Sequence, residues 1–276
     1  MTQLPEAELI FREMEKELAG KRIKDVWVAG AKFVREPSTM KAFVAGIQGA
    51  KIGEVTRRGT AILIELDGDR VLVILPGDRA RMVRHTANAK ATETVRLTMS
   101  FSTGGSVHYS DLNSDGQFLL IDTERLDAIP EFQNLGLDPL DEPIPWPVFS
   151  ADLEARKRPL LEVLVDTSFI VGIGEIYANE VLFRAGLHPL RMSDTLSNQE
   201  VRRLHRSVLE LVNDAIKAGG IDVLVEGDPD AFLPFDELEL IEVYGRAGQP
   251  DTRSRATIER FELEGGLTAF ASSAQS

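Results

Sequence analysis

The sequence predicts an α+β fold in which a strand-rich first part is followed by a helical second part. Residues 6–20 have helical periodicity, and short alternating apolar runs follow from about residue 23 to residue 121. Helical periodicity returns after residue 148, and strand patterns return after residue 239. These observations indicate an N-terminal β-sandwich-like domain that begins with a helix, a C-terminal helical domain and a terminal β-ribbon.

The first helix and two hairpins are the clearest elements of the N-terminal domain. Within residues 6–20 the apolar side chains recur at helical spacing, and Gly20 suits the position after a helix end. Two pairs of apolar runs further on are each separated by a glycine-containing turn, which is typical of a β-hairpin. They predict one hairpin from strands 62–66 and 71–75 and another from strands 95–101 and 106–110.

The second part contains a linker, a series of helices and a ribbon. Residues 138–148 are rich in proline and acidic side chains and separate the predicted domains 1–137 and 149–238. Ser197-Asn-Gln-Glu200 is a capping box, a pattern that starts a helix. The predicted helices cover residues 149–165, 174–186, 197–218 and 229–236, and the predicted ribbon within 239–276 uses strands 240–244, 257–261 and 267–270.

Length, charge and cysteine content limit the classes of function. A hydrophobic fraction of 43% over 276 residues suffices for one large core or two modest ones. We see no membrane-spanning apolar stretch and no signal-peptide pattern, so we expect a cytoplasmic protein. The absence of cysteine excludes thiolate-ligated metals. The net charge of −13 lowers the expectation of DNA binding, and it also fits a surface that only aids solubility.

One run, Ile170-Val-Gly-Ile-Gly-Glu-Ile-Tyr-Ala-Asn-Glu180, is the most specific feature of the sequence. Gly172 and Gly174 can end one helix and open another, where free N–H groups suit a phosphate. The same glycines also fit a helix junction kept only for packing. With Leu182-Phe-Arg-Ala-Gly-Leu-His-Pro189, the run resembles the helix–two-turn–helix of the formamidopyrimidine-DNA glycosylase / endonuclease VIII family.

Further segments resemble this family in the same order along the chain. Residues 4–8 resemble its N-terminal signature, Arg57-Arg58-Gly59 the start of its hairpin segment, residues 135–140 its linker entry, Gly219-Gly220 the end of its long helix, and residues 243–250 the opening of its terminal zinc finger. The resemblance therefore covers essentially the whole chain. It implies that the helical domain contains a helix–two-turn–helix and that the terminal ribbon corresponds to the finger.

The resemblance also implies a base-excision mechanism with DNA as the partner. In the family, an N-terminal amine freed by removal of Met1 attacks the sugar C1′, expels the damaged base and forms a Schiff base before strand cleavage. An adjacent glutamate moves protons at the sugar, and the damaged nucleotide is flipped out of the helix. The finger places an arginine in the minor groove.

The residues at the catalytic positions differ from the family pattern. Thr2 takes the place of the N-terminal proline, and removal of Met1 would leave it with a primary amine. Gln3 takes the place of the partner glutamate, and an amide cannot transfer the proton that base release needs. Glu6 is kept; it supports the N-terminus in the family and equally suits a first helical turn. Thr2, Gln3 and Glu6 are the candidate catalytic residues.

The DNA-facing positions differ as well. Thr60 replaces a lysine, and the loops at Gly77 and at residues 111–116 lack the side chains that fill the vacated stack. Glu175 replaces the asparagine that contacts a phosphate, and a carboxylate beside a phosphate is unfavourable. The candidate DNA-binding residues that the resemblance gives are Arg57, Arg58, Thr60, Lys157, Gly174, Glu175, Tyr244, Arg246 and Arg253.

The terminal finger is expected to hold no metal. The family's four cysteine positions fall on Asp251, Ser254, Ala271 and Ala274, and of these only Asp251 is a usual zinc ligand. The position of the groove-reading arginine falls on Gly266, so Arg253 nearby either replaces it or is merely solvated. We therefore predict a zincless β-ribbon and neither a metal nor another cofactor.

Three functional hypotheses stay open. The first is a DNA-repair glycosylase-family protein whose glycosylase and abasic-site lyase activity is lost or strongly reduced, with weak binding to damaged or abasic-site DNA. The second is an active divergent glycosylase and lyase that uses the Thr2 amine. The third is an acidic scaffold that binds a basic protein and no DNA. We expect a monomer that is not membrane-bound and that associates with the nucleoid if DNA binding is retained.

Overall fold

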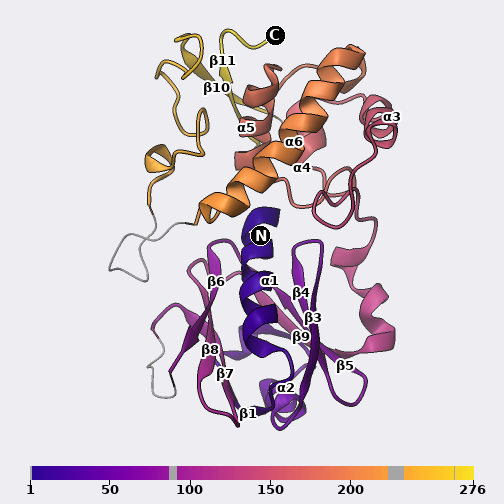
Figure 1. Cartoon of the computed structure of the whole chain (residues 1–276), viewed down its shortest axis with the longest axis vertical. Helices are drawn as coiled ribbons and strands as arrows, with labels where there is room; N and C mark the ends of the chain where they lie inside the picture. Colours follow the sequence, from indigo (N-terminus) through magenta and orange to yellow (C-terminus); the bar gives the residue numbers. More distant parts are fainter. Residues whose placement is uncertain (1, 87–91, 223–232, 264) are drawn as a thin grey trace. The chain divides into compact units, whose positions relative to one another are not determined.

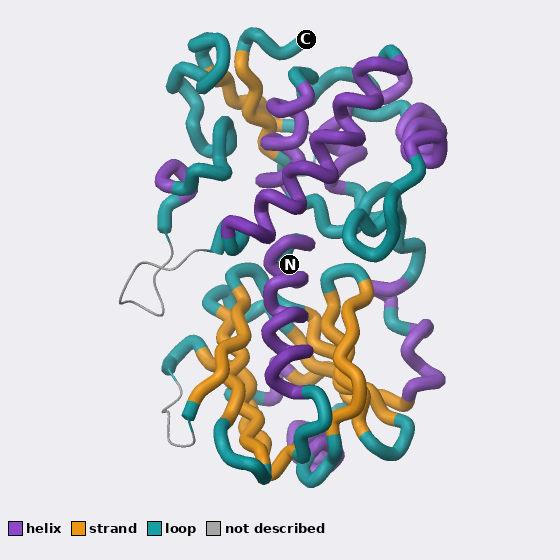
Figure 2. Tube along the Cα trace, viewed as in Figure 1, coloured by secondary structure: helices purple, strands orange, loops and turns teal. Residues whose placement is uncertain are grey.

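The chain forms two compact units, one built on β-sheets and one mainly helical (Figures 1 and 2). The first unit spans Met1–Gln133 and the second spans Asn134–Ser276. The predicted α+β class, with a helix before the sheets and a helical part after them, is confirmed. The structure is a computed structural model that describes residues 2–86, 92–222, 233–263 and 265–276.

Two sheets form the body of the first unit (Figure 1). One has four strands in the order β1-β7-β8-β6, and the other has five in the order β2-β9-β5-β4-β3. The predicted hairpins are confirmed as β4–β5 and β7–β8, with Gly68 and Gly104 at positive φ in their turns. The strands are β1 (Ile23–Val28), β2 (Val34–Glu36), β3 (Ile52–Arg58), β4 (Ala61–Leu66), β5 (Arg70–Leu75), β6 (Ala80–His85), β7 (Val95–Phe101), β8 (Ser106–Asp111) and β9 (Gln117–Asp122).

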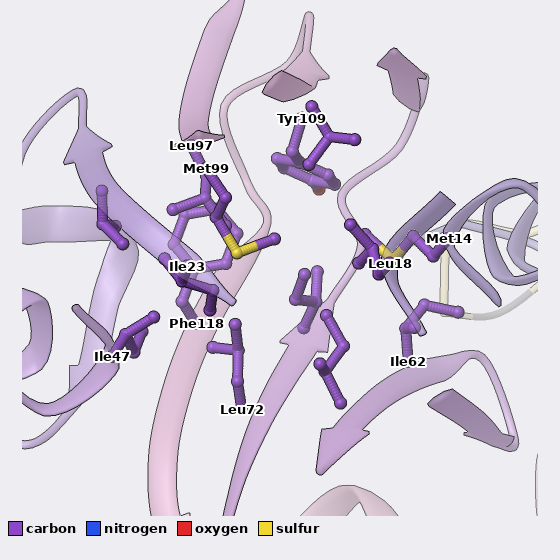
Figure 3. Close-up of a cluster of buried hydrophobic side chains, with 14 of the residues drawn as sticks. Met14, Leu18, Ile23, Ile47, Ile62, Leu72, Leu97, Met99, Tyr109 and Phe118 are labelled. Carbon is purple, nitrogen blue, oxygen red and sulfur yellow. The ribbon is translucent and has the colours of Figure 1, made fainter. Parts of the chain in front are cut away.

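Helix α1 (Leu4–Leu18) packs its apolar face into the core of the first unit. It contacts β3 and β4 of the five-stranded sheet and β6 of the four-stranded sheet. Figure 3 shows Met14 and Leu18 of α1 in one cluster with Leu72 and Met99, which come from the two different sheets. Full burial of such a side chain contributes about 1.5–3 kcal/mol. This core therefore holds the start of the chain against both sheets.

Two helix positions in the first unit differ from the prediction. Helix α1 begins at Leu4 rather than at residue 6, because a proline in the first turn lacks only an N–H that would have no helical partner. A short helix, α2 (Met40–Ile47), interrupts a region in which only strands were predicted. The Thr39 hydroxyl starts it by accepting the N–H of Ala42 at 3.2 Å.

The second unit combines helices with a two-stranded antiparallel ribbon (Figure 1). The predicted capping box is confirmed, because the Ser197 and Glu200 side chains bond each other's backbone N–H. The helices are α3 (Trp146–Arg156), α4 (Leu160–Val165), α5 (Glu175–Ala185) and α6 (Asn198–Ala218), and the ribbon strands are β10 (Ile258–Glu262) and β11 (Thr268–Ser272). Short 3-10 helices lie at Ala31–Phe33, Thr123–Ala128, Pro130–Phe132, Ser193–Thr195 and Phe235–Glu237.

Two predictions about the second unit were wrong. The single helix predicted for residues 149–165 is two helices, because Lys157 adopts a left-handed conformation and Pro159 follows it. The strand predicted for residues 240–244 is a series of turns. Three N–H groups of this segment bond to the buried Glu180 carboxylate instead of to a neighbouring strand.

The remaining prediction in this unit falls mostly outside the described residues. The short helix predicted for residues 229–236 has only its last part, from residue 233, in the described chain, where Phe235–Glu237 forms a 3-10 turn. Among the helices that the structure describes, none combines the length and the apolar character needed to cross a bilayer.

Candidate functional site

The start of the chain places two polar side chains in buried surroundings. Thr2 is only 3% exposed, and its backbone N–H donates to the Pro76 carbonyl at 3.4 Å. Neither Thr2 Oγ1 nor Gln3 Oε1 has a hydrogen-bond partner among the described residues, although both atoms are buried. A buried polar atom without a partner costs about 1–3 kcal/mol, so such atoms in a folded protein call for a functional or structural reason.

Gln3 is the residue on which α1 starts. Its backbone is extended, with φ −92° and ψ 167°, and its side chain does not bond to the helix N–H groups. The side chain therefore does not serve as a helix cap. Glu6 lies in the first turn of α1 and is 5% exposed. Thr2 and Gln3 thus lie just before α1, and the Glu6 carboxylate lies in its first turn.

Arg57, a candidate DNA-binding residue, forms a buried ion pair with Glu8. Its side chain is 4% exposed, and its guanidinium donates to Glu8 Oε2 at 2.9 Å and to the Gly59 carbonyl at 2.5 Å. Glu8 of α1 also accepts from Arg12 at 2.8 Å. Arg57 thereby ties the end of β3 to α1, and its charge is balanced within the first unit.

Arg58 and Thr60 are more accessible than Arg57. The Arg58 side chain is 37% exposed, donates to Asp127 at 2.5 Å and stacks over the Phe132 ring at 4.7 Å from its centre. Thr60 lies half-buried in the turn between β3 and β4. The turn therefore presents one partly exposed cation and one hydroxyl.

The two loops that differ from the family pattern form a single hydrogen-bonded knot. Gly77 N–H donates to the Tyr109 hydroxyl at 3.0 Å, and Asp111 accepts the N–H groups of Ser114 and Gly116 at 2.9 and 2.7 Å. Burial raises the pKa of Asp111 even though these N–H groups oppose the rise. A Cβ on Gly77 would lie 2.5 Å from Asp111 Oδ2, so only glycine fits here. This knot was missed in the sequence, where only its lack of arginine and phenylalanine was noticed.

Glu175, the first residue of α5, is engaged by the terminal ribbon and the loop before it. Gly174 is the residue before the helix and is half-buried. The Tyr244 hydroxyl donates to Glu175 Oε1 at 2.9 Å, and the Thr268 N–H donates to Oε2 at 3.0 Å. A carboxylate at a helix N-terminus also interacts favourably with the helix dipole. The Tyr244 hydroxyl and the Thr268 N–H therefore already donate to the Glu175 carboxylate at the start of α5.

The next turn of α5 fixes the same elements through residues that sequence reasoning missed. Asn179 is fully buried, donates to the Thr268 carbonyl at 3.0 Å and accepts the Phe270 N–H at 2.6 Å. Glu180 is also fully buried and accepts the three N–H groups of residues 242–244 at 2.8–3.0 Å. Burial raises the pKa of Glu180 to about 7, against the effect of the three N–H groups. In the sequence, the amide of Asn179 and the acid of Glu180 within an apolar helical run are the features that could have indicated these buried contacts.

The other candidate cations of the second unit differ in exposure. Lys157 is exposed at the end of α3. Arg246 is half-buried and donates to Gln249 at 3.0 Å. Arg253 is 48% exposed, stacks over Phe183 at 4.6 Å and donates to that residue's carbonyl at 3.2 Å. Arg253 therefore joins the ribbon segment to the end of α5.

Two of the family's four cysteine positions, Asp251 and Ser254, are joined by hydrogen bonds. Asp251 is 4% exposed and accepts the Arg253 N–H at 2.7 Å, the Ser254 N–H and hydroxyl at 2.5 Å each, and the Ser272 hydroxyl. Burial raises the pKa of Asp251, but the hydroxyls of Ser254 and Ser272 outweigh it and hold the pKa below its usual range. In the described part of the chain, no group of three or more histidine, aspartate or glutamate side chains is placed to hold a metal. We name the group of Asp251, Ser254 and Ser272 the carboxylate clasp.

Comparison with known proteins gives the same family for both units. Residues 1–118 match the family model of the formamidopyrimidine-DNA glycosylase N-terminal domain, and residues 135–226 match that of the formamidopyrimidine-DNA glycosylase H2TH domain. A formamidopyrimidine-DNA glycosylase of Pelotomaculum thermopropionicum is 30% identical over 98% of this chain and 97% of that protein. One from an Exiguobacterium species is 31% identical over 98% of both chains.

Solved structures give a concordant result. A Lactococcus lactis Fpg in complex with DNA containing an abasic site is similar with a TM-score of 0.82 and 25% identity, over 98% of this chain and 97% of that one. A mutant of the same Fpg with DNA containing a formamidopyrimidine lesion has the same TM-score and coverage. From the matched family models and the whole-length relatives, this chain belongs to the formamidopyrimidine-DNA glycosylase / endonuclease VIII family.

Proposed function

We propose that this chain is a DNA-repair protein of the glycosylase family in which base excision and abasic-site cleavage are lost or strongly reduced. Gln3 carries the proposal, because it puts an amide beside Thr2 where the family has a glutamate. Its side-chain oxygen is buried and has no partner in the described chain. General acid–base catalysis contributes about 10²–10⁴-fold to such reactions, and an amide cannot supply it near neutral pH. Thr2 and Glu6 complete the proposed catalytic position.

The proposed partner is damaged or abasic-site DNA, bound weakly. The similarity to Fpg structures that hold such DNA supports the partner. The hydrogen bonds and ion pairs of the candidate binding residues support weak binding. Glu175 accepts hydrogen bonds at the start of α5, and Arg57 is paired with Glu8. Affinity for DNA depends mainly on the number of phosphates that cations neutralise. The proposed contacts that stay accessible are Arg58, Thr60, Lys157 and, in part, Arg253.

The proposed finger is a ribbon without zinc. The carboxylate clasp supports this proposal, since Asp251 gathers donors from three positions of the ribbon segment at the place where the family has thiolates. We also propose three domains. The catalytic-type domain spans residues 1–137, the helix–two-turn–helix domain spans 149–238, and the finger spans 239–276.

The alternative function is an active, divergent glycosylase and lyase that uses the Thr2 amine. The full-length relatives favour it, because they are named as glycosylases. The buried Glu6 on the first turn of α1 is the carboxylate that this alternative would need to replace the missing glutamate.

A Gln3→Glu exchange tests the first proposal. The variant should gain excision and strand cleavage on a duplex with a formamidopyrimidine lesion, by about 10²-fold over the wild-type chain, since it regains a proton-transfer group. Product gels measure the cleavage, and Gln48→Glu, an exposed site with the same charge change, is the control.

Each outcome decides between the hypotheses. Efficient excision by the wild-type chain would establish the active alternative and contradict the proposal. Loss of all DNA retention at low salt would also contradict it and favour the acidic scaffold with a basic protein partner.

A further inference from the structure

Thr2 brings a hydroxyl as well as an amine to the proposed catalytic position. Once Met1 is removed, the two groups sit on adjacent carbons of the same residue, so covalent geometry alone places them within reach of one carbon atom. The hydroxyl oxygen is buried and has no hydrogen-bond partner in the described chain, so no described contact uses it to hold the fold. A proline at this position would carry no hydroxyl.

We propose that Thr2 captures the aldehyde of a ring-opened abasic site as a cyclic covalent adduct. This rests on the proposed binding of abasic-site DNA. The Thr2 amine adds to the C1′ aldehyde carbon, and loss of one water gives an imine. The hydroxyl oxygen then bonds to that carbon, and the imine nitrogen takes the hydroxyl proton. The product is a five-membered oxazolidine plus one water, with no oxidant or reductant consumed.

The dipole of α1 favours the ring over the open imine. A protonated imine is a cation, and it would lie beside the N-terminus of α1, a 15-residue helix whose dipole places about half a positive charge there. The ring is neutral and avoids this repulsion.

Gln3 prevents the adduct from leading to strand cleavage. Strand cleavage from an imine requires removal of a proton from the sugar carbon next to C1′, and the neighbouring amide cannot accept it. Ring closure also removes the electron-withdrawing imine that makes this proton acidic. The adduct thus holds and shields the abasic site, and it leaves the strand intact.

The test uses full-length chain whose N-terminus is Thr2, made by cleavage of a fused leader and verified by intact mass. It is incubated with an abasic-site duplex without reductant, denatured, and analysed by gel and mass. Wild type and Thr2→Ser should give an adduct of protein plus DNA minus one water. Thr2→Val keeps the shape and amine but lacks the hydroxyl, so its reductant-free adduct should fall by about tenfold while borohydride still traps its imine.

The matched control is Thr98→Val on β7, which makes the same exchange at another buried hydroxyl without a partner in the described chain. It should leave the adduct yield unchanged. A duplex labelled with ¹³C at C1′ distinguishes the saturated ring carbon from the unsaturated imine carbon by NMR. Thermal melts of each variant confirm that it folds.

Gel shifts on the same samples separate the two proposals. Equal adduct from wild type and Thr2→Val, or an unsaturated C1′ signal in the wild-type adduct, would overturn the ring closure while binding of abasic DNA stands. Bound DNA with no wild-type adduct would do the same. No shift of abasic-site duplex at low salt would instead overturn the proposed function on which the inference rests.

Discussion

At the scale of single residues, one amide and one carboxylate, each in its own unit, differ from what the family resemblance implies. Gln3 provides an amide where the family has an acid, and Glu175 provides an acid where the family has an amide. The first change removes a proton carrier, and the second adds a negative charge at a helix N-terminus that already receives the Tyr244 hydroxyl and the Thr268 N–H. Under the proposed function, we expect the first change to weaken base excision and the second to weaken DNA binding.

Neutralising Glu175 should strengthen DNA binding. In Glu175→Gln the Tyr244 and Thr268 donors face a neutral side chain, so a phosphate can compete for them. We expect duplex affinity to rise by about tenfold at low salt, the size of one charge-assisted hydrogen bond. Fluorescence anisotropy across a salt series measures it, and Glu210→Gln on α6, whose carboxylate is 60% exposed, controls for net charge. An unchanged affinity would show that these donors do not reach DNA.

Sequence reasoning identified the residue changes at the site better than it identified the contacts. The resemblance located Thr2, Gln3 and Glu175 by their positions. The ion pair between Arg57 and Glu8 could not be predicted in this way, because the two residues are far apart in sequence and meet only when α1 packs on β3. The sequence also could not predict that the buried Thr2 hydroxyl has no hydrogen-bond partner in the described chain, since hydrogen bonding of a buried group depends on the packed structure.

At the scale of elements, α5 is the anchor of the terminal segment. Glu175 lies one turn before the adjacent residues Asn179 and Glu180, and together they hold β11 and the turns at residues 242–244. This explains why the predicted strand 240–244 failed: apolar alternation fits a strand, but the N–H groups were taken by a helix 60 residues away in sequence. The hairpins were predictable, because their turns depend on local glycine-containing sequences.

The Glu180 carboxyl makes the stability of this anchor depend on pH. Its pKa in the fold is about 7 against an ordinary value of 4.5, so between these values the folded state binds more protons than the unfolded state. Stability should therefore fall as pH rises from 4.5 to 7, by on the order of 3 kcal/mol at most. Glu180→Gln should flatten this slope in urea unfolding across that range. A wild-type slope equal to that of the variant would contradict the prediction.

The carboxylate clasp should set the stability of the ribbon. Asp251→Ala leaves the hydroxyls of Ser254 and Ser272 without their shared acceptor, so the ribbon should lose on the order of 2 kcal/mol. Hydrogen exchange of Ile258–Glu262 measures the loss, with Asp214→Ala on α6, where the carboxylate is 48% exposed, as the control. Addition of a chelator to the wild-type chain should leave exchange and melting temperature unchanged; a drop in either would indicate a bound metal.

At the scale of the whole molecule, we expect the excess of acidic residues to limit attraction to nucleic acid. The chain has 44 acidic against 31 basic residues, and several arginines are paired with carboxylates of their own unit, such as Arg57 with Glu8 and Arg191 with Glu200. Pairing of this kind leaves few cations to release counterions from DNA. This expectation rests on composition alone, whereas identifying the cations that remain accessible required the structure.

The carboxylate clasp also determines how the ribbon responds to its chemical environment. A finger closed by thiolates loses its metal when peroxide oxidises the sulfur, and it cannot fold where zinc is scarce. This chain contains no cysteine, and the oxygens of Asp251, Ser254 and Ser272 are inert to such oxidants. We therefore expect a ribbon held by these oxygens to keep its shape in the presence of peroxide and of metal chelators.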